Sequence, residues 1–164
     1  MNRILDQVIP AEAVPGVVDV SEQRIIVAVD LSENSEKTAS YAIALAKGFR
    51  ASIKFVHVFP AEPMTVFRFG DIHWSHAQER DAAKDRLVGF GNKMRRVYPC
   101  CETEFRVGDT AEEVRLAAAE WNADLIVTAS YDPGFLGRLL GLERAPQIVK
   151  RAPCAVVVYH EARE

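Results

Sequence analysis

The chain has 164 residues, of which 49% are hydrophobic and 26% are charged, a composition typical of one globular domain. Its formal net charge of −3 provides no positive field to attract nucleic acid. No apolar run is long enough to span a membrane, and the three cysteines form neither a disulfide framework nor a zinc-ligand pattern. We therefore expect a cytoplasmic protein that binds no metal ion and no nucleic acid and does not associate with a membrane.

The chain divides into an extension, one domain and a short tail. Residues 1–22 contain two prolines and scattered charges and are predicted to form an N-terminal extension. The domain is predicted to cover residues 23–160, and residues 161–164 form a C-terminal tail.

The first half of the domain alternates between strand and helix patterns. Continuous apolar runs rich in β-branched residues predict strands, and apolar residues at helical spacing predict helices. Glycine or proline is expected to end each helix, Gly48 the first and Pro99 the second. The predicted order is strand 24–30, helix 36–48, strand 52–59 and helix 75–97.

The second half repeats this alternation. Residues 102–108 alternate apolar and polar side chains, which is typical of an edge strand. A helix over 109–123 is predicted to open with a capping box from Thr110 to Glu113. Strands at 124–130 and 154–160 flank a loop and a short helix at 146–151. Five strands and four helices in this order predict a doubly wound α/β fold with a parallel sheet.

In such a sheet a ligand binds outside the carboxyl ends of the strands, where the winding reverses. The simplest reversal places the first strand beside the fourth, so Asp30 would lie near the loop that follows residues 124–130. Asp30 can bind a ribose hydroxyl there, or it can cap its own turn, which is the more frequent role of an Asp at a strand end. His57 is interpreted as a satisfied strand histidine, and Cys100 and Cys101 as inert thiols with no cation beside them.

Three segments carry a resemblance to a known family: "IIVAVDLSENSEKTASYAIALAK", "VGDTAEEVRLAAAEWNADLIV" and "IVKRAPCAVVVY". From Arg24 to Tyr159 the chain resembles the universal stress protein family. This resemblance implies a Rossmann-like open sheet of five parallel strands in the order 3-2-1-4-5, similar to that of the adenine nucleotide alpha hydrolase-like proteins. It also implies a homodimer that pairs the last strand, Ala155, Val156, Val157, Val158 and Tyr159, across a two-fold axis.

One branch of that family binds ATP with magnesium through a glycine loop directly after the fourth strand. The loop reads Gly, two residues, Gly, nine residues, Gly and then Ser or Thr. Counting back from "IVKRAPC" places these positions at Ala129, Asp132, Leu142 and Glu143, none of which matches. The glycines that this segment does contain, Gly134, Gly137 and Gly141, do not coincide with the motif positions. A shift of one residue would align Gly141 with the third glycine of the motif. Carboxylates at 132 and 143 would repel a phosphate.

The adenosine side of the resemblance is better preserved. Asp30 matches the residue that meets the ribose, and Val58 the one whose backbone meets adenine. The candidate nucleotide-binding residues are therefore Asp30, Val58, Ala129, Ser130 and Gly141. We expect a non-catalytic regulatory protein of the stress response that binds ATP weakly or not at all and holds no cofactor. The alternative is an ATP-binding switch with magnesium, in which the three glycines form a variant cradle.

Overall fold

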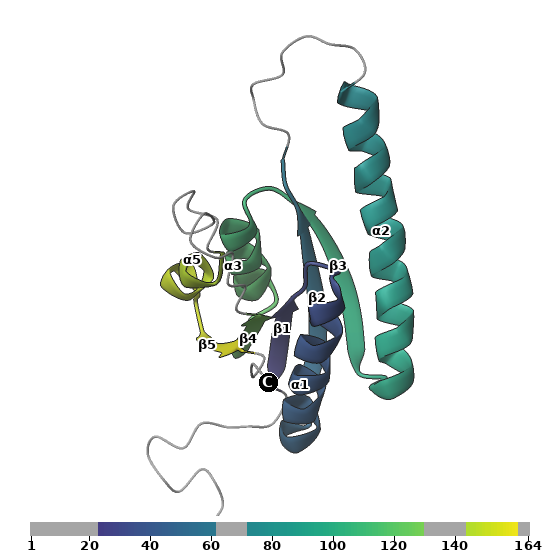
Figure 1. Cartoon of the computed structure of the whole chain (residues 1–164). Helices are drawn as coiled ribbons and strands as arrows, with labels where there is room; N and C mark the ends of the chain where they lie inside the picture. Colours follow the sequence, from purple (N-terminus) through teal and green to yellow (C-terminus); the bar gives the residue numbers. More distant parts are fainter. Residues whose placement is uncertain (1–22, 62–71, 130–143, 161–164) are drawn as a thin grey trace, which may run out of the picture.

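The computed structural model describes residues 23–61, 72–129 and 144–160, and the statements below concern these residues. Strands and helices alternate along the chain, as the patterns predict (Figure 1). The elements are β1 (Arg24–Ala28), α1 (Glu33–Phe49), β2 (Ser52–Phe59), α2 (Ile72–Val97), β3 (Cys101–Val107), α3 (Thr110–Glu120), β4 (Leu125–Ala129), α5 (Arg144–Arg151) and β5 (Ala155–Tyr159).

The five strands form one parallel sheet in the order β3-β2-β1-β4-β5. The expected order is therefore confirmed, including the reversal that places β1 beside β4. In the register of these two strands, Ile26 lies opposite Ile126 and Ala28 opposite Thr128. The carboxyl ends of β1 and β4 therefore lie side by side at the same end of the sheet.

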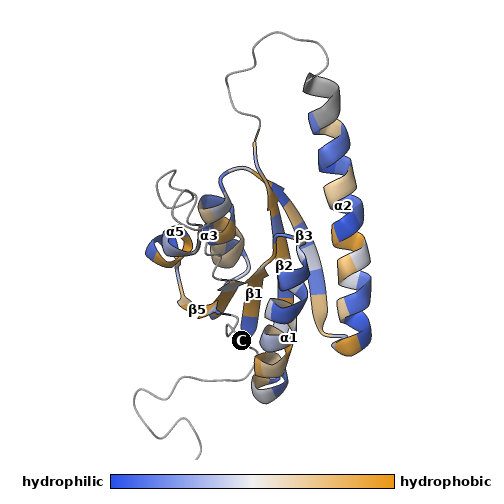
Figure 2. Ribbon diagram, in the orientation of Figure 1, coloured by the Kyte–Doolittle hydropathy of each residue, from blue (hydrophilic) through white to orange (hydrophobic). Residues whose placement is uncertain are grey.

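Helices cover both faces of this sheet, so its central strands are buried on both sides. Figure 1 shows α1 and α2 on one face and α3 and α5 on the other. Ile25 and Val27 pack toward the first helix pair, and Ile26 packs toward the second. All three side chains are fully buried, which explains the continuous apolar sequence of β1 and its hydrophobic colour in Figure 2.

The first helix continues beyond the residue predicted to end it. α1 reaches Phe49, and Arg50 rather than Gly48 takes the left-handed conformation, with φ of 55°. The backbone N–H of Ala51 donates to the carbonyl of Ala46 at 2.9 Å, which closes the last turn. Arg50 adopts a conformation that glycine usually takes at a helix end, because that closure satisfies the final backbone groups.

The third helix begins with a different cap from the predicted one. The N-cap is Asp109, whose Oδ1 accepts a hydrogen bond from the backbone N–H of Glu112 at 3.0 Å. Thr110 is the first helical residue, so the capping box predicted from Thr110 to Glu113 was wrong. Asp and Thr are both good N-caps, and the turn after Gly108, which has φ of 153°, selects Asp109.

The second helix is the longest described element. It begins at Ile72, three residues before the predicted start, and its upper end extends beyond the sheet (Figure 1). Where it crosses the sheet, Ala83, Leu87 and Met94 are buried. Phe90 meets Phe55 edge-on with ring centroids 5.3 Å apart. The predicted apolar stripe of α2 therefore faces the sheet, while Val97, predicted to belong to it, is 55% exposed.

Candidate functional site

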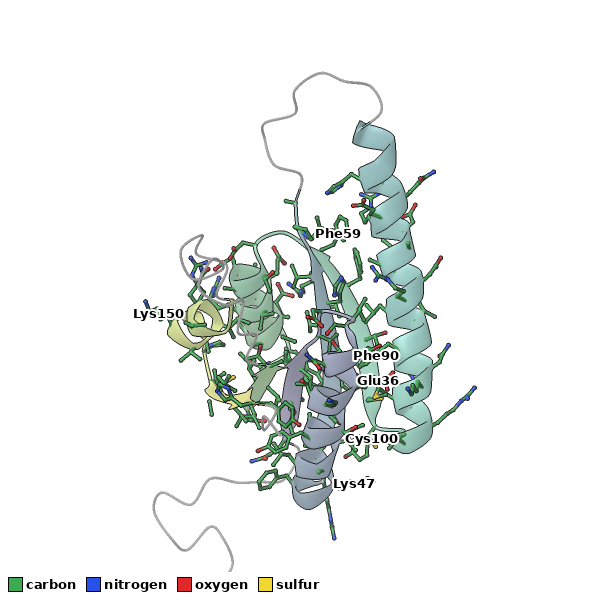
Figure 3. The ribbon with its side chains drawn as sticks, in the orientation of Figure 1. Glu36, Lys47, Phe59, Phe90, Cys100 and Lys150 are labelled. Carbon is green, nitrogen blue, oxygen red and sulfur yellow. The ribbon has the colours of Figure 1, made fainter. Side chains whose placement is uncertain are left out.

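A cavity of about 460 Å³ lies at the carboxyl ends of β1, β2 and β4. It is located where the topology predicts a ligand site, and its volume falls within the usual range for small-molecule pockets. Figure 3 labels Phe59 at this end of the sheet and Cys100 at the opposite end. The described lining residues are Ala28, Val29, Asp30, Ser35, Thr38, Val56, His57, Val58, Phe59, Pro60, Ala83, Arg86, Thr110, Val114, Thr128, Ala129 and Ile148.

Asp30 is held in this cavity by the turn that leads into α1. Its Oδ1 accepts three hydrogen bonds: from the Oγ of Ser32 at 2.6 Å, the backbone N–H of Ser32 at 2.9 Å and the Oγ of Ser35 at 2.7 Å. Leu31 between them takes φ of 62°, a left-handed conformation that is uncommon for a residue other than glycine. Within the described part of the chain, Oδ2 of Asp30 makes no hydrogen bond, so it can accept one from a ligand.

The same contacts set the charge of Asp30. Burial raises the pKa of this carboxyl, but the hydrogen bonds from Ser32 and Ser35 outweigh that effect and hold the pKa below its usual value. Asp30 is therefore ionised at neutral pH and acts as a hydrogen-bond acceptor. The turn-capping role of Asp30 is therefore confirmed for Oδ1, and the ribose-binding role stays a prediction for Oδ2.

The structure brings three of the predicted nucleotide-binding residues together. Asp30, Val58 and Ala129 all line the cavity, from the ends of β1, β2 and β4 respectively. Val58 is 6% exposed, and Ala129 is half-buried. Ser130, Asp132, Gly134, Gly137, Gly141, Leu142 and Glu143 lie outside the described residues.

Several lining residues were not predicted from the sequence. Ser35 and Thr38 are buried polar residues on the inner face of α1, and Thr110 reaches the cavity from the start of α3. Arg86 lines the cavity from α2, 56 positions away from Asp30 in the chain. The one available signal was the Ser at 35, five residues after an Asp at a strand end, which is a spacing compatible with turn capping.

His57 is satisfied, as the sequence indicated. Its Nδ1 lies 2.9 Å from the carbonyl oxygen of Val29, and because a carbonyl only accepts, Nδ1 carries the proton and donates. The ring also packs against Phe105, with centroids 5.8 Å apart. This contact orients the His57 ring at the cavity wall and joins the end of β1 to that of β2.

The cysteines lie away from this cavity. Cys100 and Cys101 line a second cavity of about 330 Å³ at the amino ends of the strands, and both are free thiols. Burial raises the pKa of Cys101, whereas the charge of Arg95 lowers it and Cys100 raises it, with a net increase. The prediction that no cation acts on these thiols was therefore wrong for Cys101, although its raised pKa leaves the thiol protonated at neutral pH.

β5 forms one edge of the described sheet. Its residues are only partly covered: Ala155 is exposed and the four that follow are half-buried. Val157 pairs with Val127 of β4 and packs against the core on the α1 side. Tyr159 meets Tyr41 of α1 with ring centroids 5.2 Å apart.

Two wider properties of the described residues also bear on function. No described helix combines the length and the apolar character that crossing a membrane requires. Across residues 23–61, 72–129 and 144–160, no group of three or more His, Cys, Asp or Glu side chains is arranged to hold a metal ion.

Comparison with known proteins agrees with this geometry. A model described as the Universal stress protein family matches residues 22–160. The chain belongs to the universal stress protein family. A curated relative, Universal stress protein Sll1388 from Synechocystis sp., is 24% identical over 149 residues, which are 84% of this chain and 91% of the relative.

Solved structures of universal stress proteins share the fold. The universal stress protein UspA from Lactobacillus plantarum is 21% identical, with a TM-score of 0.66 over 83% of this chain and 96% of its own. A universal stress protein solved in complex with cAMP is also 21% identical, with a TM-score of 0.58 over 85% of this chain and 97% of its own. At this identity the likeness establishes the doubly wound Rossmann-like architecture.

Proposed function

We propose that this universal stress protein is a non-catalytic regulatory module of the cytoplasm, whose cavity takes the adenosine part of an adenine nucleotide and which binds ATP weakly. The observation that carries the proposal is the arrangement of Asp30. Its Oδ1 is occupied by the Ser32 and Ser35 hydrogen bonds, while Oδ2 can accept a ribose hydroxyl. Val58 lines the same cavity and supplies apolar and backbone surface for a base.

The polar groups of the cavity support binding rather than catalysis. A general base works best when its pKa is near the working pH, and the lowered pKa of Asp30 makes it a weak base. The Ser35 hydroxyl donates to Asp30 at 2.7 Å, and His57 Nδ1 donates to the Val29 carbonyl at 2.9 Å. Both donors are therefore already used within the protein, Ser35 to hold the turn after β1 and His57 to hold the carbonyl of Val29 before that turn.

Weak binding of ATP follows from charge. Asp30 is an ionised carboxylate in the cavity, and the sequence between β4 and α5 contains two more acids, Asp132 and Glu143. Two like charges about 4 Å apart cost on the order of 4 kcal/mol at an effective dielectric of about 20, which is nearly a thousandfold in affinity. A ligand with few phosphates is less affected than one with three.

Calorimetric titration of the full-length protein tests this function. We expect adenosine to bind more tightly than about 1 mM and Mg-ATP to bind no more tightly than that. Asp30→Asn should weaken adenosine binding about tenfold, because an amide accepts a ribose hydrogen bond less strongly than a carboxylate. Asp124→Asn makes the same change at the opposite end of the sheet, where Asp124 caps the backbone N–H of Arg24, and should leave adenosine binding unchanged.

The two candidate functions give different results in this titration. Micromolar affinity for Mg-ATP would contradict the proposal and favour the alternative switch, in which Gly134, Gly137 and Gly141 cradle the phosphates. Absence of adenosine binding, with the protein shown to be folded by circular dichroism, would contradict an adenosine site of either kind.

We also propose that the protein forms a homodimer through β5. This strand ends the described sheet, so one row of its backbone N–H and C=O groups is available to another strand. Its side chains from Ala155 to Tyr159 carry no charge that would oppose pairing. Tyr41, which is 38% exposed and contacts Tyr159, extends the apolar surface beside this edge.

A further inference from the structure

Arg86 is the only lysine or arginine among the described residues that line the cavity. It lies on the part of α2 that passes the carboxyl end of the sheet, next to the buried Ala83. Asp30 lines the same cavity from the end of β1, yet the two side chains do not form an ion pair. The described part of the cavity therefore contains a carboxylate and a guanidinium that do not neutralise each other.

The sequence of α2 explains why Arg86 has no partner on its own helix. Side chains three and four positions apart are neighbours on a helix, and those positions around Arg86 hold no acid. They are Ala82, Ala83, Gly89 and Phe90. Asp85 directly precedes it, but adjacent residues on a helix do not face each other.

Other cations of α2 do have partners. Lys84 contacts Asp81 at 3.5 Å, and Lys93 contacts Glu36 of α1 at 2.6 Å. Arg86 makes neither an ion pair nor a hydrogen bond with any residue that the structure describes. An arginine left without a carboxylate at the wall of a cavity, with five N–H donors in a planar fork, is suited to an anionic ligand.

The other polar groups on this side of the cavity are already engaged. Thr38 Oγ1 donates to the Asn34 carbonyl at 3.1 Å, in the manner of a hydroxyl that bonds within its own helix. Ser35 donates to Asp30 and His57 donates to Val29, as described above. An anionic group in this cavity therefore meets Arg86 as the one lysine or arginine among the described lining residues.

We propose that Arg86 forms an anion subsite on the α1–α2 side of the cavity, which binds the phosphate of a nucleoside monophosphate whose ribose hydroxyls face Asp30. This inference rests on the proposed adenosine site and adds a second determinant of specificity to it. A single guanidinium offsets a larger share of the charge of one phosphate group than of a triphosphate chain. Arg86 therefore favours a monophosphate over both the uncharged nucleoside and ATP.

The test compares adenosine and AMP, which differ only in the phosphate, as ligands of the full-length protein. Arg86 is exposed, so solvent screens part of its interaction with the phosphate, and wild type should bind AMP about threefold to tenfold more tightly than adenosine in calorimetry. Arg86→Gln should lose most of this ratio while its affinity for adenosine stays within about twofold. Arg80→Gln removes the same charge from the same helix at a residue that is not among the described lining residues and whose Nε lies 4.0 Å from Oδ1 of Asp81, and it should keep the ratio.

A second measurement follows Arg86 itself and does not need the purine. The Nε–H resonance of Arg86 in ¹H–¹⁵N spectra, assigned by its loss in Arg86→Gln, should shift when AMP or ribose 5-phosphate is added to wild type. Adenosine alone should leave it nearly unmoved.

The outcomes separate the subsite from the adenosine site. Equal affinities of wild type for adenosine and AMP, or an unchanged ratio in Arg86→Gln, would overturn the subsite and leave the adenosine site standing. A shift of Arg86 by ribose 5-phosphate in a protein that does not bind adenosine would support the subsite and remove the adenosine site. If neither AMP nor ribose 5-phosphate shifts the resonance, the subsite is wrong.

Discussion

The Oγ of Ser35 donates a hydrogen bond to Oδ1 of Asp30 at 2.7 Å, and so joins the end of β1 to the first turn of α1. This bond favours the ionised carboxylate, and Ser35→Ala should therefore raise the pKa of Asp30. The pKa can be measured by ¹³C NMR of the Asp30 carboxyl carbon. An unchanged pKa in the variant would show that Ser32 alone holds the charge.

The sign of the accompanying stability change follows from linkage. The folded-state pKa of Asp30 is lower than its unfolded value, so the group stabilises the fold above the unfolded pKa of about 3.9, and this contribution is lost as pH falls through the folded pKa. Ser35→Ala should lower the free energy of unfolding at pH 7 by about 1 kcal/mol, since solvent screens the exposed carboxylate. Below pH 3 the difference between the two proteins should shrink.

Two glycines of α2 provide a matched pair. A Cβ at Gly91 would lie 2.6 Å from Cγ2 of Thr103 on β3, whereas one at Gly89 would meet nothing within 4 Å. Gly89→Ala should stabilise the protein by about 0.5–1 kcal/mol, because alanine is the better helix former. Gly91→Ala should be less stable than Gly89→Ala by about 1–3 kcal/mol in urea unfolding. Equal stabilisation by both changes would mean that Thr103 rotates away without cost.

Glu104 of β3 lies between two cations, Lys54 at 3.1 Å and Arg106 at 2.5 Å. Burial raises the pKa of Glu104, but its hydrogen bonds to Lys54 and Arg106 outweigh this and lower it. Glu104→Gln should destabilise the protein by about 1–3 kcal/mol at pH 7, because it leaves two largely buried cations short of a partner. The deficit should disappear as pH falls through the lowered pKa of Glu104, at which wild type also loses this charge.

The control for this change is Glu102→Gln. Glu102 contacts the same Lys54 at 3.1 Å, but its side chain is 56% exposed, against 27% for Glu104. Exposed ion pairs contribute little, so the substitution should change stability by less than about 1 kcal/mol. Thermal unfolding of both variants measures the difference, and an equal effect would refute the role given to burial.

The proposed dimer is tested at Val157, in the middle of the β5 edge. Val157→Pro removes a backbone donor and should convert the dimer to a monomer in analytical ultracentrifugation. Val157→Ala loses much of the same side-chain packing but keeps the donor, and it should remain a dimer. Hydrogen exchange of the β5 amides in wild type adds a second readout, since dilution should increase exchange at the dimer edge. A dimer that survives the proline with β5 exchange unaffected by dilution would point to another interface.

Much of the candidate site could be predicted because it depends on topology. The apolar run of β1, and the strand–helix alternation after it, require a parallel sheet, and the reversal of winding then places Asp30 and Ala129 at one crevice. Val58 joins them because β2 lies directly beside β1 in the sheet. Arg86 could not be predicted in this way, because its position depends on how α2 crosses the sheet, and no local pattern encodes that crossing.

Local signals also left choices that packing decided. Gly48 and Thr110 are both good residues for the helix ends that the sequence suggested, but Arg50 and Asp109 perform these roles. The free-energy differences between neighbouring caps are about 1 kcal/mol or less, which is small compared with the burial of an apolar helix face.

By itself, the sequence determined the order of strands and helices, the parallel sheet and the end of the sheet where a ligand site is expected, because hydrophobic period and short connections allow few arrangements. Only the tertiary structure decided that one oxygen of Asp30 is used by Ser32 and Ser35, and that Arg86 lines the same cavity with no ion-pair partner among the described residues. These properties depend on distances between residues far apart in the chain, which are set when helices pack against both faces of the sheet.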